Sequence, residues 1–154
     1  MSSASRSRTE LAQALRAVLL DAAEAASLDV HGRIDAAVLV PLYLKDGALH
    51  AVFTRRRDNL RRHAGEISFP GGRQDDDETD LRLTALREAE EEIGLRPRAV
   101  EIVGALQPTP TIATNYAVYP FVGLIEAGHA WQPSATSASA GRHACPGSIR
   151  PTKG

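Results

Sequence analysis

Apolar residues recur at helical spacing near the start of the chain. Residues 9–27 contain the following apolar positions three or four apart: Leu11, Leu15, Val18, Leu19 and Ala22. This spacing places them on one face and predicts an amphipathic helix over residues 9–27. Residues 1–8 are rich in Ser and Arg, and we expect them to be frayed.

Denser apolar runs elsewhere predict strands. Residues 35–44 read DAAVLVPLYL and end at Asp46-Gly47, a pair typical of a tight hairpin turn. The return strand is expected over residues 50–55. Further strands are predicted in the following ranges: 66–69, 98–107 and 113–125. A turn at Gly65 precedes the first of these strands, and Pro70-Gly71-Gly72 follow it. A helix is then predicted over residues 79–93, and Gly94 ends it.

The composition changes sharply near the C-terminal end. Residues 127–154 contain no Asp or Glu and are dominated by Ser, Ala, Gly and Pro, without either apolar period. Such a segment predicts a disordered tail. We therefore divide the chain into a helical segment at 1–30, a domain at 31–126 and a tail at 127–154.

Bulk composition excludes several classes of protein. The chain has 154 residues, 43% hydrophobic and 24% charged, which fits one globular domain. A net charge of −1 argues against a nucleic-acid polymer as partner. Cys145 is the only cysteine, so neither an intramolecular disulfide nor a Cys-based zinc site is expected. Without a signal-like or membrane-spanning apolar run, we expect a cytoplasmic protein with no membrane partner.

The predicted helix over residues 79–93 carries an unusual group of carboxylates. Glu88 and Glu92 are four residues apart, so they share one face, and Glu91 flanks that face. Glu90 points elsewhere. Oxygen ligands of this kind select a hard cation, Mg²⁺ or Mn²⁺. For the helix alone, however, a solvated acidic face is the commoner explanation.

Residues beside the helix favour a site over a solvated face. Gly71 and Gly72 allow backbone groups to approach a metal or a phosphate closely. Arg87 is placed to pair with an acidic loop residue such as Glu78 and to hold that loop against the helix. The arginine-rich stretch at residues 55–62 could hold phosphates, although a solvated basic loop is an alternative interpretation.

The run from Gly72 to Leu95 resembles the box of the Nudix hydrolase family, G-x5-E-x7-R-E-U-x-E-E-x-G-U, where U is bulky and apolar. Gly72 and Glu78 fit its first half, and residues 87–95 (REAEEEIGL) fit its second half. There are two departures. Eight residues, not seven, separate Glu78 from Arg87, and Ala89 is small where the pattern has bulk.

The segment before the box is similar to the additional signature of the coenzyme A pyrophosphatase branch, roughly L-L-T-x-R-S…R-x3-G-x3-F-P-G-G. The matching positions are Thr54, Arg56, Arg61, Gly65, Phe69, Pro70, Gly71 and Gly72. Arg57 stands where serine is usual. The resemblance implies an α+β fold, an α/β/α sandwich around a mixed sheet.

The resemblance also implies roles for individual residues. The expected metal ligands for Mg²⁺ or Mn²⁺ are Glu88, Glu91, Glu92 and the Gly72 carbonyl. The expected catalytic residues are Glu91, Glu88 and Arg87. One of the glutamates, more likely Glu91, could act as the base for the attacking water instead of binding the metal. The expected substrate-binding residues are Arg56, Arg61 and Gly71. His63 could contact phosphate or simply be solvated, and Phe69 is expected to pack in the core.

The implied activity is hydrolysis of coenzyme A, or a derivative, to 3′,5′-ADP and phosphopantetheine. One alternative is hydrolysis of another nucleoside diphosphate derivative, such as ADP-ribose or a dinucleotide. Another is an inactive nucleotide-binding module, because the family character ends near Ala135 in a way that resembles a truncation or a shifted reading frame. An incomplete domain predicts an open sheet edge and an uncovered apolar face, which favour aggregation or a homodimer.

Overall fold

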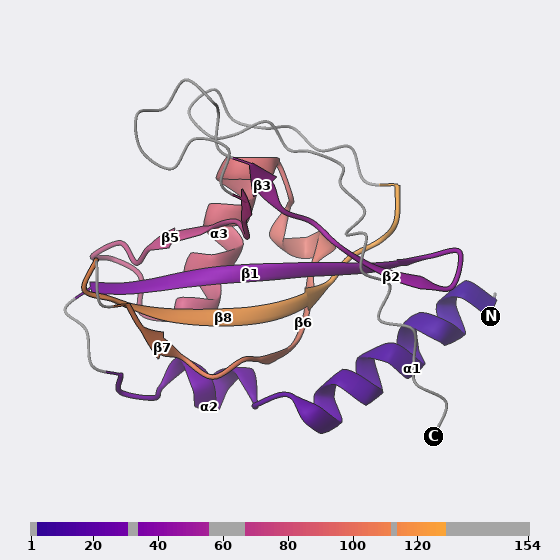
Figure 1. The fold of residues 1–154 in the computed structure, drawn as a ribbon, viewed down its shortest axis with the longest axis horizontal. Helices are drawn as coiled ribbons and strands as arrows, with labels where there is room; N and C mark the ends of the chain where they lie inside the picture. Colours follow the sequence, from indigo (N-terminus) through magenta and orange to yellow (C-terminus); the bar gives the residue numbers. More distant parts are fainter. Residues whose placement is uncertain (1–2, 31–33, 56–66, 112–113, 129–154) are drawn as a thin grey trace.

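The computed structural model describes residues 3–30, 34–55, 67–111 and 114–128. Its centre is a mixed sheet with helices on both sides (Figure 1). The strands of this sheet are β1 Ile34–Lys45, β2 Ala48–Ala51, β5 Gly71–Arg73, β6 Glu101–Ala105, β7 Thr109–Pro110 and β8 Tyr116–Leu124. A separate pair consists of β3 Thr54–Arg55 and β4 Ile67–Ser68. The predicted α+β class with a mixed sheet is confirmed.

The main strand order is β2-β1-β8-β6, so β2 and β6 lie at the edges of this path. Strands β1 and β8 run parallel along the middle of the sheet, from the Ile34–Tyr116 pair to the Leu42–Leu124 pair. β5 pairs antiparallel with β1 on the side away from β8, and β7 pairs antiparallel with β8. This arrangement places β5 and β6 on opposite sides of the β1–β8 centre.

The hairpin after β1 forms as the sequence predicts. Asp46 and Gly47 have φ angles of 53° and 73°, the left-handed values that a two-residue hairpin turn requires. β2 returns along β1 with His50 opposite Tyr43, and the two rings stack with centroids 5.0 Å apart. The predicted return strand at 50–55 is in fact divided, because Thr54–Arg55 leaves β1 and pairs with β4.

The N-terminal segment contains two helices where the sequence predicted one over residues 9–27. α1 spans Ser3–Val18 and α2 spans Ala22–Ala26. The single-helix prediction was wrong because Leu20 leaves the helical path and forms a β-bridge with Ala105 of β6. Asp21 then starts α2 by accepting a hydrogen bond from the backbone N–H of Glu24 at 3.0 Å.

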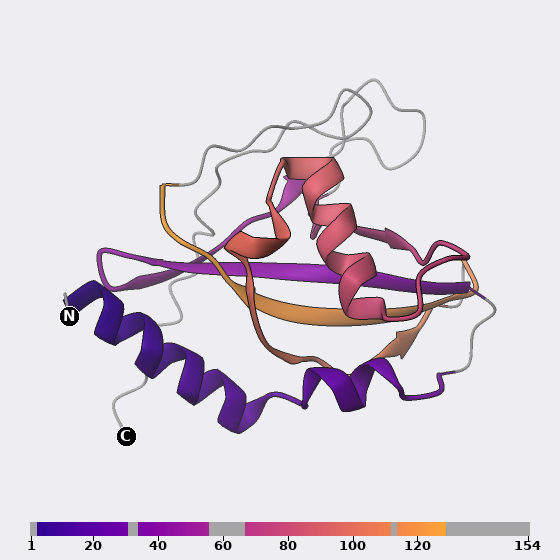
Figure 2. The same ribbon diagram turned by 180° about the vertical axis from the view of Figure 1, so that it is seen from behind.

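The third helix, α3, spans Leu81–Ile93 and covers one face of the sheet (Figure 2). Its buried positions contact odd-numbered residues of β1 and β8, forming the main core cluster. Members of that cluster include Leu81, Ala85, Ala89 and Ile93 of α3 with Ala37, Leu39 and Phe121 of the sheet. Ala89 is fully buried, so the small residue at this position is accommodated by close packing of the helix on the sheet.

The opposite face of the sheet carries a smaller cluster. Val40, Val122 and Leu124 point to this side, as the alternation along a strand requires. They pack against Ala12 of α1. Phe69 joins this cluster and stacks on Phe53 with centroids 4.6 Å apart, which confirms its packing role.

No strand was predicted at Pro70-Gly71-Gly72, which follow the predicted strand at residues 66–69. Gly71 and Gly72 lie in β5, opposite Val38 and Ala37 of β1. A side chain on Gly71 would collide with the Ala37 carbonyl oxygen, at 2.5 Å from an added Cβ. Gly71 therefore allows a close approach between strand backbones, a role that periodicity could not detect because glycine has no side chain.

Candidate active site

Arg87, in the middle of α3, lies at the centre of a network of carboxylates. Its Nε and Nη2 donate to the two carboxylate oxygens of Glu78 at 3.1 and 3.0 Å. Nη2 also donates to the Arg73 carbonyl oxygen at 3.0 Å. The predicted pairing of Arg87 with Glu78 is confirmed, and it holds the loop after β5 against the helix in a two-pronged ion pair.

The pKa values of this pair follow from that contact. Burial tends to raise the pKa of Glu78, but hydrogen bonds from Arg87 and from the backbone N–H of Asp75 outweigh it and lower the pKa. The same pairing raises the pKa of Arg87. Both groups are therefore charged at neutral pH, and the loop is fixed electrostatically.

Arg87 also contacts two of the predicted metal ligands. Its Nη1 donates to Glu88 Oε1 at 3.0 Å and to the Glu91 carboxylate at 3.1 and 3.2 Å. The Glu91 side chain is 58% exposed, against 16% for Glu88. Glu91 is thus reachable by solvent, whereas Glu88 is turned inward.

Glu88 packs directly against Gly72 of β5. A Cβ added to Gly72 would lie 2.5 Å from Glu88 Cδ and Oε1, so the carboxylate occupies the space that any larger residue would need. The Gly72 backbone and the Glu88 carboxylate are therefore adjacent, as their joint prediction as metal ligands requires. Gly71 donates its backbone N–H to Glu92.

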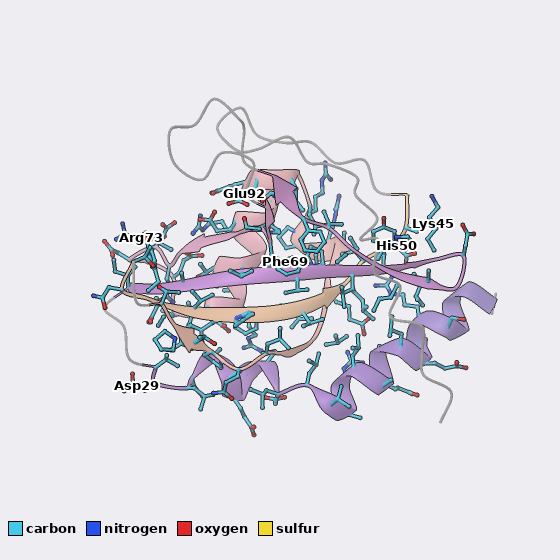
Figure 3. The ribbon with its side chains drawn as sticks, viewed as in Figure 1. Asp29, Lys45, His50, Phe69, Arg73 and Glu92 are labelled. Carbon is cyan, nitrogen blue, oxygen red and sulfur yellow. The ribbon has the colours of Figure 1, made fainter. Side chains whose placement is uncertain are left out.

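Glu88 and Glu92 are carboxylates in an environment that disfavours their charge. Burial, and then the charge of Glu88, raise the pKa of Glu92 to about 7. Burial also raises the pKa of Glu88, which the neighbouring Arg87 only partly offsets. Two half-buried carboxylates on one helix face repel each other, and a bound cation would relieve that repulsion. Figure 3 shows Glu92 near the top of α3, beside β3.

The donor chemistry of this face fits a hard divalent cation. Carboxylate oxygens from Glu88, Glu91 and Glu92 and a carbonyl oxygen from Gly72 form an all-oxygen set. Across the described residues, no three acidic, His or Cys side chains already converge as a metal-binding group. The Arg87 guanidinium lies between Glu88 and Glu91 instead. Glu90 is exposed, away from this face, as predicted.

Several predicted residues lie outside the described part of the chain. They are Arg56, Arg61, His63 and Gly65, and their roles remain predictions. Conversely, Asp75 belongs to the network and was not predicted individually. Its carboxylate lies 3.4 Å from Arg87 Nε, and its N–H donates to Glu78. The only signal in the sequence was its place in the acidic stretch before α3.

Comparison with known proteins agrees with this arrangement of sheet and helices. The NUDIX domain profile matches residues 33–138, more than half of the chain. The chain belongs to the Nudix hydrolase family. The match extends past residue 126, where the predicted domain ends.

Among curated proteins, the chain is 48% identical over 99 residues to the peroxisomal coenzyme A diphosphatase NUDT7 of Mus musculus. That match covers 64% of this chain and 41% of the mouse protein. It is 46% identical over 90 residues to the uncharacterized Nudix hydrolase NudL of Escherichia coli, covering 58% of this chain and 46% of NudL. The chain spans about half the length of the curated relatives it matches.

Solved structures share the fold. The Caenorhabditis elegans Ap4A hydrolase binary complex has a TM-score of 0.56 at 18% identity, covering 68% of this chain and 75% of that one. The NUDIX domain of Shewanella oneidensis NrtR with ADP ribose has a TM-score of 0.55 at 19% identity, covering 75% and 76%. The predicted Nudix fold is confirmed by these likenesses, which at such identities concern the fold alone. Among the described residues, no helix has the length and apolar character to cross a membrane.

Proposed function

We propose that this chain hydrolyses the pyrophosphate bond of coenzyme A or a derivative, giving 3′,5′-ADP and phosphopantetheine. The observation that carries the proposal is the face of α3 on which Glu88 and Glu92 are held together against β5 with raised pKa values. The named activity of the mouse relative, coenzyme A diphosphatase, supports this choice of substrate.

We propose that Glu88, Glu91, Glu92 and the Gly72 carbonyl hold Mg²⁺ or Mn²⁺. When bound, such a cation neutralises the diphosphate and lowers the pKa of a coordinated water. Glu88 and Glu92 are fixed by β5 and by burial. The fold therefore fixes the positions of these two carboxylates in the proposed site.

Glu91 is the proposed base. Its side chain is 58% exposed, so a water molecule can reach the carboxylate and transfer a proton to it. Arg87 holds Glu91 at 3.1 Å and Glu78 at 3.0 Å, and it therefore acts as a positioning residue. Loss of Arg87 would free the loop and the base together.

We propose that Arg56 and Arg61 bind the diphosphate and that Gly71 lies beside it. A guanidinium pairs two phosphate oxygens at once, which suits this task. The net charge of −1 supports a small nucleotide rather than a nucleic-acid polymer as the substrate. We propose that the protein is cytoplasmic. The name of the mouse relative places that protein in the peroxisome, and cell fractionation with an antibody would decide between the two compartments.

The test is Mg²⁺-dependent release of 3′,5′-ADP from coenzyme A, followed by chromatography. Glu92→Gln is expected to reduce kcat/KM by about 100-fold or more, equivalent to about 2.7 kcal/mol. Glu90→Gln is the matched control, because it removes the same charge from an exposed position of the same helix. It should retain activity close to the unmutated level.

Three outcomes would change the proposal. Equal release by the unmutated protein and Glu92→Gln would remove the metal-site assignment. Binding of coenzyme A without turnover would favour a nucleotide-binding module. Faster turnover of ADP-ribose or a dinucleotide in a substrate panel would replace coenzyme A as the substrate while keeping the chemistry.

A further inference from the structure

Thr84 is a polar residue at a core position of α3. Its side chain is fully buried, on the same side of the helix as the core residues Leu81 and Ala85. Among the described residues, its Oγ1 is the one buried side-chain oxygen or nitrogen without a hydrogen-bond partner. A buried hydroxyl without a partner costs free energy, so packing alone does not explain a threonine here.

The local helix does not satisfy this hydroxyl either. Threonine in a helix usually donates its hydroxyl to the carbonyl oxygen three or four residues earlier. For Thr84 these are the carbonyl oxygens of Leu81 and Asp80, and neither accepts from Oγ1. Valine has the same branched shape and would fill the same space without an unpaired hydroxyl. The Thr84 hydroxyl is thus free to serve a group outside its own helix.

That group is the Glu78 carboxylate, in the loop before α3. Burial raises the pKa of Glu78, hydrogen bonds from Arg87 and from the Asp75 N–H lower it, and the Thr84 hydroxyl adds to the lowering. A hydroxyl has this effect only when it is close to the carboxylate and presents its O–H to the charged form. Thr84 and Glu78 are therefore neighbours across the junction of loop and helix.

The Glu78 carboxylate has room for one more donor. Its Oε1 accepts from Arg87 Nη2 and from the Asp75 N–H, whereas its Oε2 accepts only from Arg87 Nε among the described residues. A carboxylate accepts about four hydrogen bonds, two at each oxygen. The Glu78 side chain is 13% exposed, so little water can reach the remaining position on Oε2.

We propose that Thr84 is a positioning residue of the active site, whose buried hydroxyl supports the Glu78 carboxylate from the helix side. Glu78 holds Arg87, and Arg87 Nη1 donates to Glu88 and to Glu91. A hydroxyl that fixes Glu78 thereby fixes the guanidinium that orders two of the proposed metal ligands. This role rests on the proposed function, because that order matters to the chemistry only where these carboxylates bind the cation.

Two substitutions separate the hydroxyl of Thr84 from its methyl group. Thr84→Val keeps the branched shape and removes the hydroxyl, whereas Thr84→Ser keeps the hydroxyl and is the matched control. The first measurement is the exchange of the Arg87 Nε–H with water, by NMR on the metal-free protein, with the signal assigned by its loss in Arg87→Lys. Because Nε donates to Glu78 Oε2 at 3.1 Å, its exchange reports whether the carboxylate stays in place. Exchange should be about threefold faster or more in Thr84→Val and close to the unmutated rate in Thr84→Ser.

The second measurement compares function with stability. Thr84→Val should bind Mn²⁺ about threefold more weakly or worse and lose kcat on coenzyme A to a similar extent, while Thr84→Ser should stay close to the unmutated protein in both. The urea midpoints should rank the other way, with Thr84→Ser the less stable variant, because loss of the methyl group leaves a cavity. A threonine with only a packing role would make function follow stability.

Exchange and Mn²⁺ affinity that follow the hydroxyl, against the order of stability, support the proposal. Unchanged Nε–H exchange in Thr84→Val overturns it, and so do equal losses of Mn²⁺ affinity in the two variants. Faster exchange with unchanged Mn²⁺ affinity overturns it as well, because Glu78 would then position nothing in the site. If the unmutated protein neither binds Mn²⁺ nor hydrolyses coenzyme A, the proposed function fails, while the exchange of Arg87 Nε–H still decides whether Thr84 fixes Glu78.

Discussion

At the scale of single residues, Glu92 lies in surroundings that destabilise its ionised form. Burial and the nearby charge of Glu88 raise its pKa to about 7. A carboxyl group whose pKa is higher in the folded state stabilises the fold only at low pH, and that contribution is lost as the pH rises through the folded-state pKa. The ionised Glu92 therefore destabilises the metal-free protein above neutrality.

Replacing Glu92 with Gln should consequently stabilise the metal-free protein at pH 8. Glutamine keeps the shape and cannot ionise, so the expected gain in unfolding free energy is on the order of 1–3 kcal/mol. At pH 4, where the carboxyl group is protonated in both states, the gain should vanish. Urea titrations in EDTA at both pH values measure the difference. A variant that is equally stable or less stable at pH 8 would contradict the buried, repelled carboxylate.

Gly71 and Gly72 are adjacent glycines with different reasons to be glycine. A Cβ on Gly71 would meet backbone, the Ala37 carbonyl oxygen at 2.5 Å, whereas a Cβ on Gly72 would meet the end of the Glu88 side chain. Backbone cannot yield easily, but a glutamate side chain can rotate away. The first glycine is thus a requirement of the fold, and the second is a requirement of the site.

This difference predicts opposite phenotypes for two alanine variants. Gly71→Ala should lose about 1–3 kcal/mol of stability through overpacking. Gly72→Ala should lose less stability but bind Mn²⁺ more weakly, because the Glu88 carboxylate is displaced. Chemical denaturation and Mn²⁺ titration of both variants test the pair. Similar losses of stability in the two variants, with unchanged Mn²⁺ affinity, would show that Glu88 does not depend on Gly72.

At the scale of elements, the two ends of α3 fix the height of the carboxylates above the sheet. Asp80 caps the start by accepting from the Arg82 N–H at 2.9 Å. Gly94 ends the helix in the left-handed region, with φ 70°, and donates to the Glu90 carbonyl oxygen at 3.0 Å. Leu95 then returns directly to the core, where it is fully buried.

The left-handed conformation of Gly94 at the end of α3 can be tested by substitution. Gly94→Ala should cost about 1 kcal/mol, because alanine rarely adopts a positive φ. Gly94→Asn should cost less, since asparagine tolerates the left-handed region better. The thermal unfolding midpoints of the two variants show which is more stable. If alanine were tolerated as well as asparagine, the left-handed end would not be what stops α3.

Elements with strong local signals were predictable from the sequence. Asp46-Gly47 identified the hairpin, and Gly94 identified the end of α3, because both turns depend on the local backbone. The break between α1 and α2 was not predictable, since Leu20 leaves the helix for a partner on β6, 85 residues away. β5 was also missed, because its two glycines give no alternating pattern.

The site was predictable in part for the same reason. Helical spacing alone placed Glu88 and Glu92 on one face, and charge suggested the pairing of Arg87 with Glu78. The raised pKa of Glu92 and the packing of Glu88 on Gly72 could not be predicted, because both arise from β5 lying against α3. Asp75 was missed because its neighbours Asp76 and Asp77 carry the same side chain.

At the scale of the whole molecule, α3 separates two surfaces. One flank holds carboxylates against β5, and the other lines an apolar groove at the β6 edge. The core residues between them, such as Ala85 and Ile93, are fully buried and fix the helix on the sheet. Substitutions on one flank can therefore be made without altering the other.

We propose that the Glu88–Glu92 face binds a divalent cation. Titration with Mn²⁺, followed by electron paramagnetic resonance, measures this binding directly. The unmutated protein should bind Mn²⁺, Glu90→Gln should bind it with similar affinity, and Glu92→Gln should bind it at least about tenfold more weakly. Equal affinities in Glu92→Gln and Glu90→Gln would contradict the account, because the two variants remove the same charge from the same helix.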